Sequence, residues 1–285
     1  MKILLTGASG FIGARVASRL APTHRLYCAM QREDAVLPRG ALGVIADLAT
    51  EIDLNSLPTQ IDAVLHLAQS RRYRDFPAAA GEIYAINTAA TATLLQYAAA
   101  AGATRFILAS TGTVYEPYAG RLAEETRVIP TSFYSATKLA AEALLQGWRS
   151  KFRCCALRLF FPYGPGQTER LIPSLVERIR AGRTVTLDGR DGLVLVPTFV
   201  DDLAAVFVAA LECEWNGIFN VAAPHPVTLR ELALTIGRVI GVEPRFEWTG
   251  VREAQRVVPE LQLLAEHYDL TRFRPVEVGL TDALA

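Results

Sequence analysis

Residues 1–13 read MKILLTGASGFIG, a short apolar run that leads into three glycines spaced three residues apart. The run from Ile3 to Thr6 is predicted to be a buried strand and Phe11 to Leu20 a helix, so the glycines fill the turn between them. Glycine permits the tight turn and lets the backbone approach a pyrophosphate, which the amino end of the helix then faces. The pattern predicts a dinucleotide-binding turn, with an ordinary strand-to-helix turn as the alternative. The candidate cofactor contacts in this turn are Gly7, Ser9, Gly10, Phe11, Ile12 and Gly13.

The composition restricts the class of partner. The 285 residues are enough for one large domain with a sizeable core, and 29 Lys and Arg residues balance 29 Asp and Glu residues. This balance gives no electrostatic footprint for nucleic acid or an anionic membrane. No stretch reaches the roughly 20 apolar residues of a membrane helix, and the amino terminus lacks the pattern of a secretory signal. We therefore expect a small-molecule substrate, no nucleic-acid or membrane partner, and a cytoplasmic location.

The four cysteines support the same location. Cys28, Cys154, Cys155 and Cys213 show no CxxC spacing, and the adjacent pair lies in an apolar run. Neither a metal site nor a disulfide framework is expected from them. A reducing compartment is therefore the default expectation.

Short apolar runs alternate with longer helical patterns over the first 160 residues. This alternation predicts βαβ units and a parallel sheet buried on both faces, an α/β fold of the Rossmann, doubly wound type. Right-handed crossovers would place the carboxyl ends of the first and fourth strands at a topological switch point, where ligands bind. The expected strands are Ile3–Thr6, Arg25–Met30, Val44–Ala46, Ala63–His66, Arg105–Ala109 and Cys154–Phe160, and the later helices are Ala78–Ala101 and Phe133–Lys151.

The pattern loosens after Phe160, where we expect a smaller, discontinuous substrate lobe. Residues 188–192 suggest a hairpin, and the apolar stretches Val194–Val200 and Ile218–Val221 are expected to return to the main sheet. The further expected helices are Leu171–Ala181, Asp201–Leu211 and Thr228–Ile240. The predicted domains are residues 1–162 plus about 194–222 for the dinucleotide-binding domain, and about 163–193 plus 223–285 for the lobe.

The end of the second strand bears on which dinucleotide is bound. A carboxylate there would bind the ribose 2′-hydroxyl of NAD, whereas an arginine would bind the 2′-phosphate of NADP. Gln31 and Arg32 occupy this place, and Glu33 and Asp34 follow. NADP is therefore favoured over NAD, with Arg32 as the phosphate contact, unless Arg32 is a solvated surface residue. Asp47 would reach the adenine edge or cap the next helix.

Tyr134 and Lys138 are four residues apart in a predicted helix and project from one face. A reaction that interconverts carbonyl and alcohol needs a group that donates or removes a proton at the oxygen. A free phenol has a pKa of about 10, and moving it toward 7 takes about 4 kcal/mol, part of which an adjacent ammonium can supply. A hydroxyl from Thr111 or Ser110, at the end of the fifth strand, would orient the carbonyl. Chance spacing in a helix is the alternative.

Taken together, these segments resemble the extended short-chain dehydrogenase/reductase family, which includes NAD-dependent epimerases and dehydratases of nucleotide sugars. The resemblance covers almost the whole chain. It rests on TGASGFIG (6–13), ADL (46–48), HLA (66–68), Asn87, RFILASTGTVYEP (105–117), YSATK (134–138), LRLFFPYGPGQ (157–167), FVDDLA (199–204) and FNVAAP (219–224).

The resemblance implies roles for individual residues. Thr111 corresponds to the catalytic Ser or Thr, Tyr134 to the acid/base and Lys138 to its partner, while His66 is expected to be structural. Family members often dimerise through two helices of each subunit, here about 78–101 and 133–151, so a homodimer is expected by analogy. Ala68, Asn87 and Pro162 are the cofactor contacts that the resemblance implies, and the other candidate cofactor contacts beyond the glycine turn are Arg32, Asp47, Leu48, Tyr134 and Lys138.

Four departures from the family pattern limit the choice of cofactor, reaction and substrate. The missing acid after the second strand favours NADP. Gly112 and Thr113 stand where dehydratases usually have Asp-Glu, which argues against dehydration. Phe161 replaces a substrate-binding Asn, and Leu195 and Val196 replace an Arg-Asp pair, which leaves the usual diphosphate contacts in question.

The sequence thus predicts an NAD(P)-dependent oxidoreductase that reduces or epimerises a keto or hydroxyl group of a nucleotide-linked sugar. A reductase of a non-nucleotide aldehyde or ketone is the alternative, and a dinucleotide sensor without turnover is a second one. The candidate substrate contacts are Gln69, Thr111, Gly112, Phe161, Gln167 and Arg170.

Overall fold

The computed structural model describes residues 1–32, 36–251 and 253–284. Glu33 and Asp34, which bear on the choice of dinucleotide, lie outside the described residues. The chain divides into two compact units, which we describe one at a time. Unit 1 comprises Met1–Pro117, Arg127–Leu159 and Ala204–Asn220, and unit 2 comprises Tyr118–Thr126, Phe160–Leu203 and Val221–Ala285.

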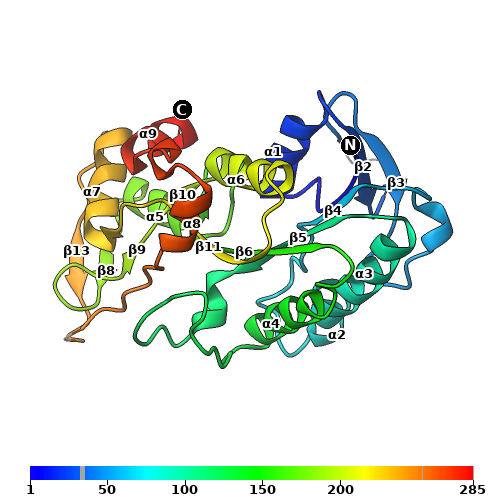
Figure 1. Cartoon of the computed structure of the whole chain (residues 1–285). Helices are drawn as coiled ribbons and strands as arrows, with labels where there is room; N and C mark the ends of the chain where they lie inside the picture. The colour runs from blue at the N-terminus through cyan, green and yellow to red at the C-terminus, as the bar shows by residue number, and fades with distance from the viewer. Residues whose placement is uncertain (33–35, 252, 285) are drawn as a thin grey trace. The chain divides into compact units, whose positions relative to one another are not determined.

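A seven-stranded sheet forms the framework of unit 1, in the order β11-β6-β5-β4-β1-β2-β3 (Figure 1). All pairings among β1 to β6 are parallel. The chain passes from β1 outward to β2 and β3 and then returns to β4 on the other side of β1, which makes the expected switch point. The fold class is therefore confirmed. The strands are β1 (Lys2–Thr6), β2 (Arg25–Met30), β3 (Leu42–Ile45), β4 (Ala63–His66), β5 (Arg105–Thr111), β6 (Arg153–Leu159) and β11 (Gly217–Val221).

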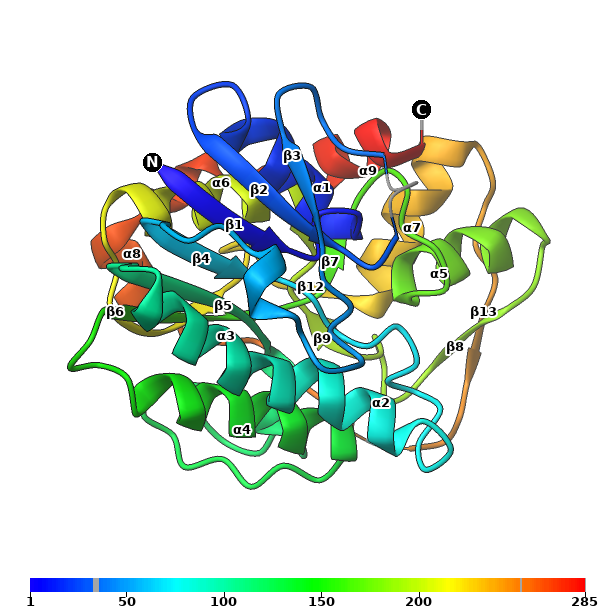
Figure 2. The same cartoon turned by 90° about the vertical axis from the view of Figure 1, so that its right-hand side faces the viewer.

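Both faces of the central strands are buried, which explains their continuous apolar sequences. Leu4, Val64 and Phe106 pack with residues of α3 and α4 in one apolar cluster, while the alternating neighbours Ile3 and Leu65 are equally buried. Figure 2 shows α3 and α4 along one face of the sheet and α1 on the other. The helices that lie wholly in unit 1 are α1 (Phe11–Leu20), η1 (Leu54–Ser56), α2 (Ala80–Tyr84), η2 (Ala85–Ala89), α3 (Ala90–Ala100), η3 (Gly112–Tyr115) and α4 (Phe133–Gln146), and α6 spans Val200–Glu212.

The helix expected over 78–101 is interrupted, so the prediction of one regular helix is wrong in its middle. Residues Ala85–Ala89 form a π-helical turn, η2, between α2 and α3. A π turn holds one residue more than an α turn, and such turns are frequent at functional sites. The helix expected over 133–151 begins at Phe133 as predicted but ends at Gln146.

Unit 2 contains three two-stranded sheets and corrects two expectations. The hairpin expected at 188–192 is absent from the described residues, because β8 pairs in parallel with β13 and β9 pairs antiparallel with β12. The stretch 194–200 divides into β9 and β10, and β10 pairs with β7 instead of joining the main sheet. The elements are β7 (Pro162–Tyr163), α5 (Leu171–Arg180), β8 (Val185–Leu187), β9 (Val194–Leu195), β10 (Thr198–Phe199), β12 (Val227–Thr228), α7 (Leu229–Ile240), β13 (Phe246–Trp248), α8 (Gln262–His267), η4 (Leu270–Arg272) and α9 (Val276–Leu284).

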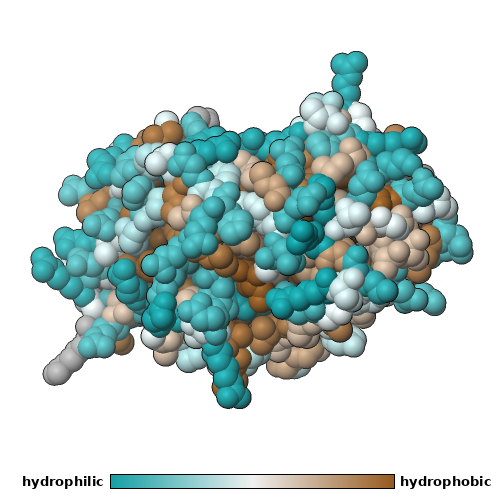
Figure 3. Space-filling model, in the orientation of Figure 1, coloured by the Kyte–Doolittle hydropathy of each residue, from teal (hydrophilic) through white to brown (hydrophobic). Residues whose placement is uncertain are grey.

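The surface is largely hydrophilic on the face drawn in Figure 3, where apolar atoms occupy smaller areas. Among the described residues, none of the helices has the length and apolar character needed to span a bilayer. All four cysteines are free thiols.

Candidate active site

The glycine turn is packed so closely that side chains would not fit. The N–H of Gly10 donates to the carbonyl of Gly7 across 2.9 Å. A Cβ on Gly13 would lie 1.9 Å from the Gly7 oxygen, and one on Gly7, whose φ is +75°, would lie 2.7 Å from the nitrogen of Ala68. The turn therefore lies against the end of β4 at the switch point, with α1 beginning directly after it. This backbone surface fits the close approach of a pyrophosphate.

His66 links this turn to the helix layer. Its Nδ1 lies 2.7 Å from Thr6 Oγ1 and its Nε2 lies 3.1 Å from Thr91 Oγ1. The Thr6 oxygen also accepts a hydrogen bond from the N–H of Ala68. Burial, reinforced by the nearby Lys138 ammonium, lowers the pKa of His66 to about 3. The ring is therefore neutral at physiological pH and acts as a structural link, the role that the resemblance implied.

The ends of β2 and β3 carry the candidate contacts to the adenosine half of a dinucleotide. Arg32 is exposed just after β2. Asp47 accepts a backbone hydrogen bond two residues further on and another, at 3.3 Å, from the Gln31 amide. It closes a turn and does not cap a helix, because η1 is capped by Asp53. Leu48 packs against the core of unit 1.

Tyr134 lies in the first turn of α4, which is held by a capping box between Ser132 and Ser135. Its hydroxyl donates to Gln69 Oε1 across 2.7 Å. The ring is half-buried and contacts the ring of Tyr73 at a centroid distance of 4.7 Å. The structure thus brings together the predicted acid/base and a predicted substrate contact, with the phenol proton directed at a polar partner.

Lys138 lies one helical turn after Tyr134 and is only 2% exposed. Burial lowers the pKa of its ammonium to about 8, while the Glu142 carboxylate opposes the shift. Over the described part of the chain, no carboxylate forms an ion pair with this ammonium. A buried cation on the same helix face, one turn after a phenol, favours the phenolate form of that phenol.

Thr111 is the last residue of β5 and is almost buried. Its Oγ1 accepts the N–H of Thr113 across 3.2 Å, which turns the chain into η3 at Gly112. The side chains of Thr111 and Thr113 lie 3.1 Å apart at their hydroxyl oxygens. The hydroxyl is therefore fixed at the carboxyl edge of the sheet.

Asn87 lies in the π-helical turn and has two protein partners. Its Oδ1 accepts the N–H of Ser70 and its Nδ2 donates to Thr137 Oγ1, both across 3.0 Å. The Thr137 hydroxyl in turn donates to the carbonyl of Tyr134 across 2.8 Å. The structure therefore gives Asn87 a part in holding α4.

Reasoning from the sequence missed a buried polar network beside these residues. Glu142 and Arg158 form an ion pair with Nη2 and Oε2 2.7 Å apart, and their side chains are 2% and 3% exposed. Ser110 also donates to Glu142, and Arg158 donates to the Tyr115 hydroxyl across 2.7 Å. The available signal was one acidic and one basic residue in otherwise apolar runs, which predicts a buried pair but not its partners.

The remaining candidates belong to unit 2. Gln167 donates to the carbonyl of Pro162 across 2.6 Å, so these two lie together. Phe161 has a φ of +40° and packs at the edge of the apolar core of this unit. Arg170 immediately precedes α5, and Leu195 is fully buried.

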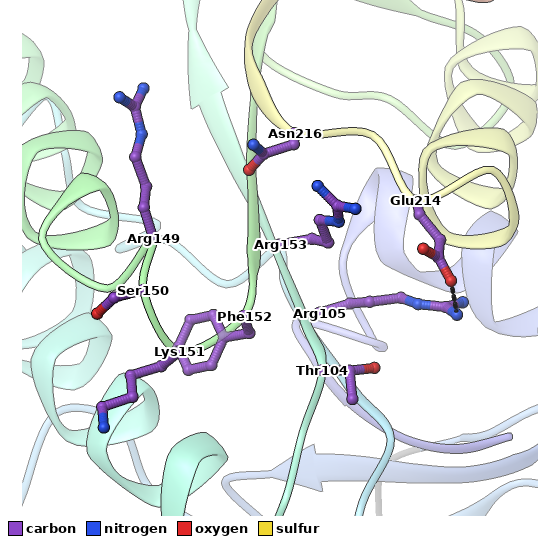
Figure 4. Close-up of a pocket in the computed structure, with 9 residues that line it drawn as sticks. All are labelled: Thr104, Arg105, Arg149, Ser150, Lys151, Phe152, Arg153, Glu214 and Asn216. Carbon is purple, nitrogen blue, oxygen red and sulfur yellow. Dashed lines mark hydrogen bonds and ion pairs between the residues drawn. The ribbon is translucent and has the colours of Figure 1, made fainter.

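A hollow of about 540 Å³ lies at the amino ends of β5 and β6 (Figure 4). Arg105, at its edge, is paired with Glu214. Figure 4 shows the side chains of Arg149 and Lys151 pointing in different directions. Its basic groups do not converge, and it lies at the edge of the sheet opposite the glycine turn, so it is not the candidate active site.

A switch-point sheet with a glycine turn is the arrangement of a Rossmann-type dinucleotide-binding protein. The profile of the NAD dependent epimerase/dehydratase family matches residues 3–222. The chain belongs to this family, and it is an enzyme of the epimerase/dehydratase type.

Individual relatives agree with this membership. UDP-glucose 4-epimerase of Mycolicibacterium smegmatis is 30% identical over 272 residues, which cover 86% of this chain and 85% of that protein. The trifunctional UDP-glucose 4,6-dehydratase/UDP-4-keto-6-deoxy-D-glucose 3,5-epimerase/UDP-4-keto-L-rhamnose-reductase RHM3 of Arabidopsis thaliana is 27% identical over 85% of this chain. The chain spans only 40% of the length of that relative.

A solved structure extends the likeness in fold to nearly the whole chain. UDP-glucuronic acid 4-epimerase from Bacillus cereus, in complex with UDP-glucuronic acid and NAD, has a TM-score of 0.86 and 22% identity, and covers 99% of this chain and 98% of its own. At this identity the likeness concerns the fold.

Proposed function

We propose that this enzyme reduces or epimerises a keto or hydroxyl group of a nucleotide-linked sugar, with Tyr134 as acid/base, Lys138 as its charged partner and Thr111 as the orienting hydroxyl. The observation that carries the proposal is the phenol of Tyr134. It donates its proton to the polar side chain of Gln69 at 2.7 Å, one helical turn before a buried ammonium. A sugar oxygen in place of the Gln69 oxygen would exchange the same proton.

The residues divide the chemistry as follows. A bound nicotinamide dinucleotide supplies or accepts the hydride at carbon. Tyr134 removes the proton from the hydroxyl oxygen during oxidation and returns a proton during reduction, so the keto group forms and disappears with charge balanced. Thr111 donates a hydrogen bond to the same oxygen, and the Lys138 ammonium stabilises the phenolate.

The glycine turn, Asp47 and Ala68 are proposed to hold the dinucleotide. The similar Bacillus cereus structure contains NAD, and we propose NAD as the first cofactor to test. The preference for NADP expected from Arg32 has no support from the comparisons and stays a prediction.

Reduction or epimerisation is proposed in preference to dehydration. Dehydration requires a further acid/base pair, which the resemblance would place just after Thr111. Gly112 and Thr113 stand there, and neither side chain can titrate near neutral pH.

A substrate panel tests the proposal. UDP-glucose and UDP-glucuronic acid are incubated with the protein and either NAD or NADP, and a UDP-4-keto sugar is incubated with the protein and either NADH or NADPH. The sugar products are separated by anion-exchange chromatography while reduced cofactor is followed by absorbance. An epimer without net change in cofactor indicates epimerisation, and stoichiometric oxidation of NADH or NADPH by a keto sugar indicates reduction. Absence of turnover with every nucleotide sugar, while small carbonyl compounds react, would reject the sugar assignment.

The second candidate, reduction of a non-nucleotide aldehyde or ketone, is favoured by unit 2. Phe161, Leu195 and Val196 put apolar side chains where the resemblance expects diphosphate contacts, and Leu195 and Val196 are buried. The same assay with aromatic and aliphatic aldehydes and NADPH distinguishes the two substrates.

The domain assignment and the homodimer also stay proposals. Unit 2 contains all the residues proposed for the substrate lobe, which supports that division, but it also contains residues 194–203, which were proposed for the dinucleotide-binding domain. The proposed dimer face has a hollow of about 490 Å³ between the α2–α3 region and α4, bordered by alanines and by the exposed Tyr84 and Leu144. Leu144→Glu should convert a dimer to a monomer in light scattering, and a monomeric wild type would reject the proposal. A cytoplasmic location stays a prediction.

A further inference from the structure

The buried carboxylate of Glu142 has no part in the chemistry proposed above, yet it is held from two strands. Ser110 Oγ donates to its Oε1, and Arg158 Nε donates to the same oxygen across 3.1 Å. Arg158 Nη2 donates to Oε2 across 2.7 Å. Ser110 and Arg158 are register partners on β5 and β6, so one carboxylate of α4 joins both strands.

This network is connected to all three proposed catalytic residues. Glu142 follows Tyr134 and Lys138 at successive helical turns, so the three lie on one face of α4. Ser110 immediately precedes Thr111 in β5.

The other end of the ion pair supports the turn after Thr111. Arg158 Nη1 donates to the hydroxyl of Tyr115, which ends η3, and that hydroxyl donates to Asn220 Oδ1 across 2.9 Å. The Arg158 guanidinium also lies over the Tyr115 ring, 4.8 Å from its centroid. The ion pair therefore holds both α4, which carries Tyr134 and Lys138, and the turn η3, which follows the Thr111 hydroxyl.

The pair also sets the charges around Lys138. Lys138 lowers the pKa of His66, which lies on β4 and is neutral, and Glu142 raises the pKa of Lys138. Tyr134 lies one helical turn before Lys138 on α4. Arg158 of β6 holds the opposite charge in contact with the Glu142 carboxylate and also contacts the Tyr115 hydroxyl. Removing one leaves the other buried and uncompensated.

We propose that Glu142 and Arg158 form a positioning pair that fixes α4 against β5 and β6 and balances the charge beside the Lys138 ammonium. The proposal rests on the proposed function, in which that ammonium supports proton exchange by Tyr134. If the pair had only a structural role, removing either residue would lower stability, but it would not shift the pKa of Lys138 in opposite directions.

The test is the pH profile of kcat/KM with whichever nucleotide sugar the wild-type protein turns over. The alkaline limb of this profile is expected to follow the loss of the proton from the Lys138 ammonium. In Glu142→Gln the remaining guanidinium repels that ammonium and lowers its pKa, so the alkaline limb should move to lower pH by about one unit. In Arg158→Gln the remaining carboxylate attracts it, so the limb should move to higher pH by about one unit. Ser110→Ala, which changes no charge, should leave the position of the limb unchanged. Glu214→Gln, at the surface ion pair with Arg105, is the matched control and should leave the whole profile unchanged.

The double variant Glu142→Gln/Arg158→Gln provides a test if the single variants do not fold, because it leaves no unpaired buried charge. We expect it to fold, to bind NAD as the wild type does in a fluorescence titration, and to lose about tenfold or more in kcat because α4 is no longer fixed. Single variants whose limbs move in the same direction or not at all, or a double variant with wild-type kcat, would overturn the proposal. A wild-type protein inactive on the whole panel rejects the proposed function instead.

Discussion

The side-chain amide of Asn87 donates to Thr137 Oγ1 across 3.0 Å and thereby joins the π-helical turn η2 to α4. The Thr137 hydroxyl donates a hydrogen bond to the carbonyl of Tyr134. Asn87 also accepts the N–H of Ser70, one residue after Gln69. The first turn of α4 and the loop that meets the phenol are therefore held by the same amide.

Asn87→Ala should lower the free energy of unfolding by about 1–3 kcal/mol, because it leaves buried polar groups without partners. Urea denaturation followed by circular dichroism measures the change. The control is Asn55→Ala, whose exposed amide donates to Asp53 and which should change stability by less than about 0.5 kcal/mol. Equal effects in the two variants would show that Asn87 does not hold α4.

Tyr134→Phe removes the proposed acid/base while keeping the ring. We expect kcat to fall by about 10²- to 10⁴-fold, with affinity for the dinucleotide nearly unchanged. Tyr73→Phe is the control, since its ring lies 4.7 Å from that of Tyr134 and it has no proposed role in proton transfer. Steady-state kinetics and a cofactor titration decide the matter, and a fully active Tyr134→Phe would exclude this phenol as the acid/base.

Gly13→Ala places a Cβ 1.9 Å from the Gly7 carbonyl oxygen. The clash should cost about 1–3 kcal/mol of stability and weaken dinucleotide binding. Gly81→Ala is the matched substitution, because a Cβ there meets no atom within 4 Å, and it should stabilise by about 0.5–1 kcal/mol. Isothermal titration with NAD and urea unfolding provide the two readouts. Unchanged binding in Gly13→Ala would remove the turn from the cofactor site.

Arg32→Ala separates the two dinucleotides. If the exposed guanidinium binds a 2′-phosphate, the substitution should weaken NADPH by about 10-fold or more and leave NADH within about twofold. Arg39→Ala, another exposed arginine of the same unit, controls for the loss of one surface charge. An equal effect on NADPH and NADH would remove the basis for expecting NADP.

The neutral His66 predicts a pH dependence of stability. Its pKa is about 3 in the folded protein, against 6.5 for an ordinary imidazole, so the unfolded chain takes up a proton first as the pH falls. The contribution of neutral His66 to the free energy of unfolding is fully present above the pKa of the unfolded chain. As the pH falls from that value toward the pKa of the folded protein, the contribution is lost by up to about 1.4 kcal/mol per pH unit.

Between about pH 6.5 and pH 5, wild-type protein should therefore lose about 2 kcal/mol more stability than His66→Gln. His225→Gln, which replaces an exposed histidine, should lose as much as the wild type. Urea unfolding at the two pH values gives the comparison, and parallel losses in wild type and His66→Gln would show that His66 is not held neutral.

The local sequence was sufficient to predict the bounds of strands on both sides of the switch point. Arg25–Met30 and Ala63–His66 have the predicted bounds. Ala63–His66 is buried on both faces, and such a strand has a short apolar run. The start of α4 at Phe133 was also predicted, from the helical pattern that follows Pro130, and the structure adds the serine capping box that holds its first turn.

Features that depend on distant partners could not be predicted. The positive φ of Gly189 and Gly192 agrees with the turn signals at 188–192, but β8 and β9 pair with strands about 60 and 33 residues away instead of with each other. Glu142 and Arg158 find each other only when α4 lies across β5 and β6. Propensity carries no information about such contacts.

The π turn η2 takes up one extra residue while the helices on either side stay nearly in phase. Each residue of a regular α-helix turns the following side chains by about 100°, so one more inserted residue would rotate α2 by that amount relative to α3. Deleting one residue of 85–89 would restore a regular helix and redirect the side chain of Asn87, which lies inside the turn. The N–H of Ser70 would then lose the Asn87 oxygen, or Thr137 would lose its nitrogen. Insertions and deletions should therefore be far less tolerated here than point substitutions.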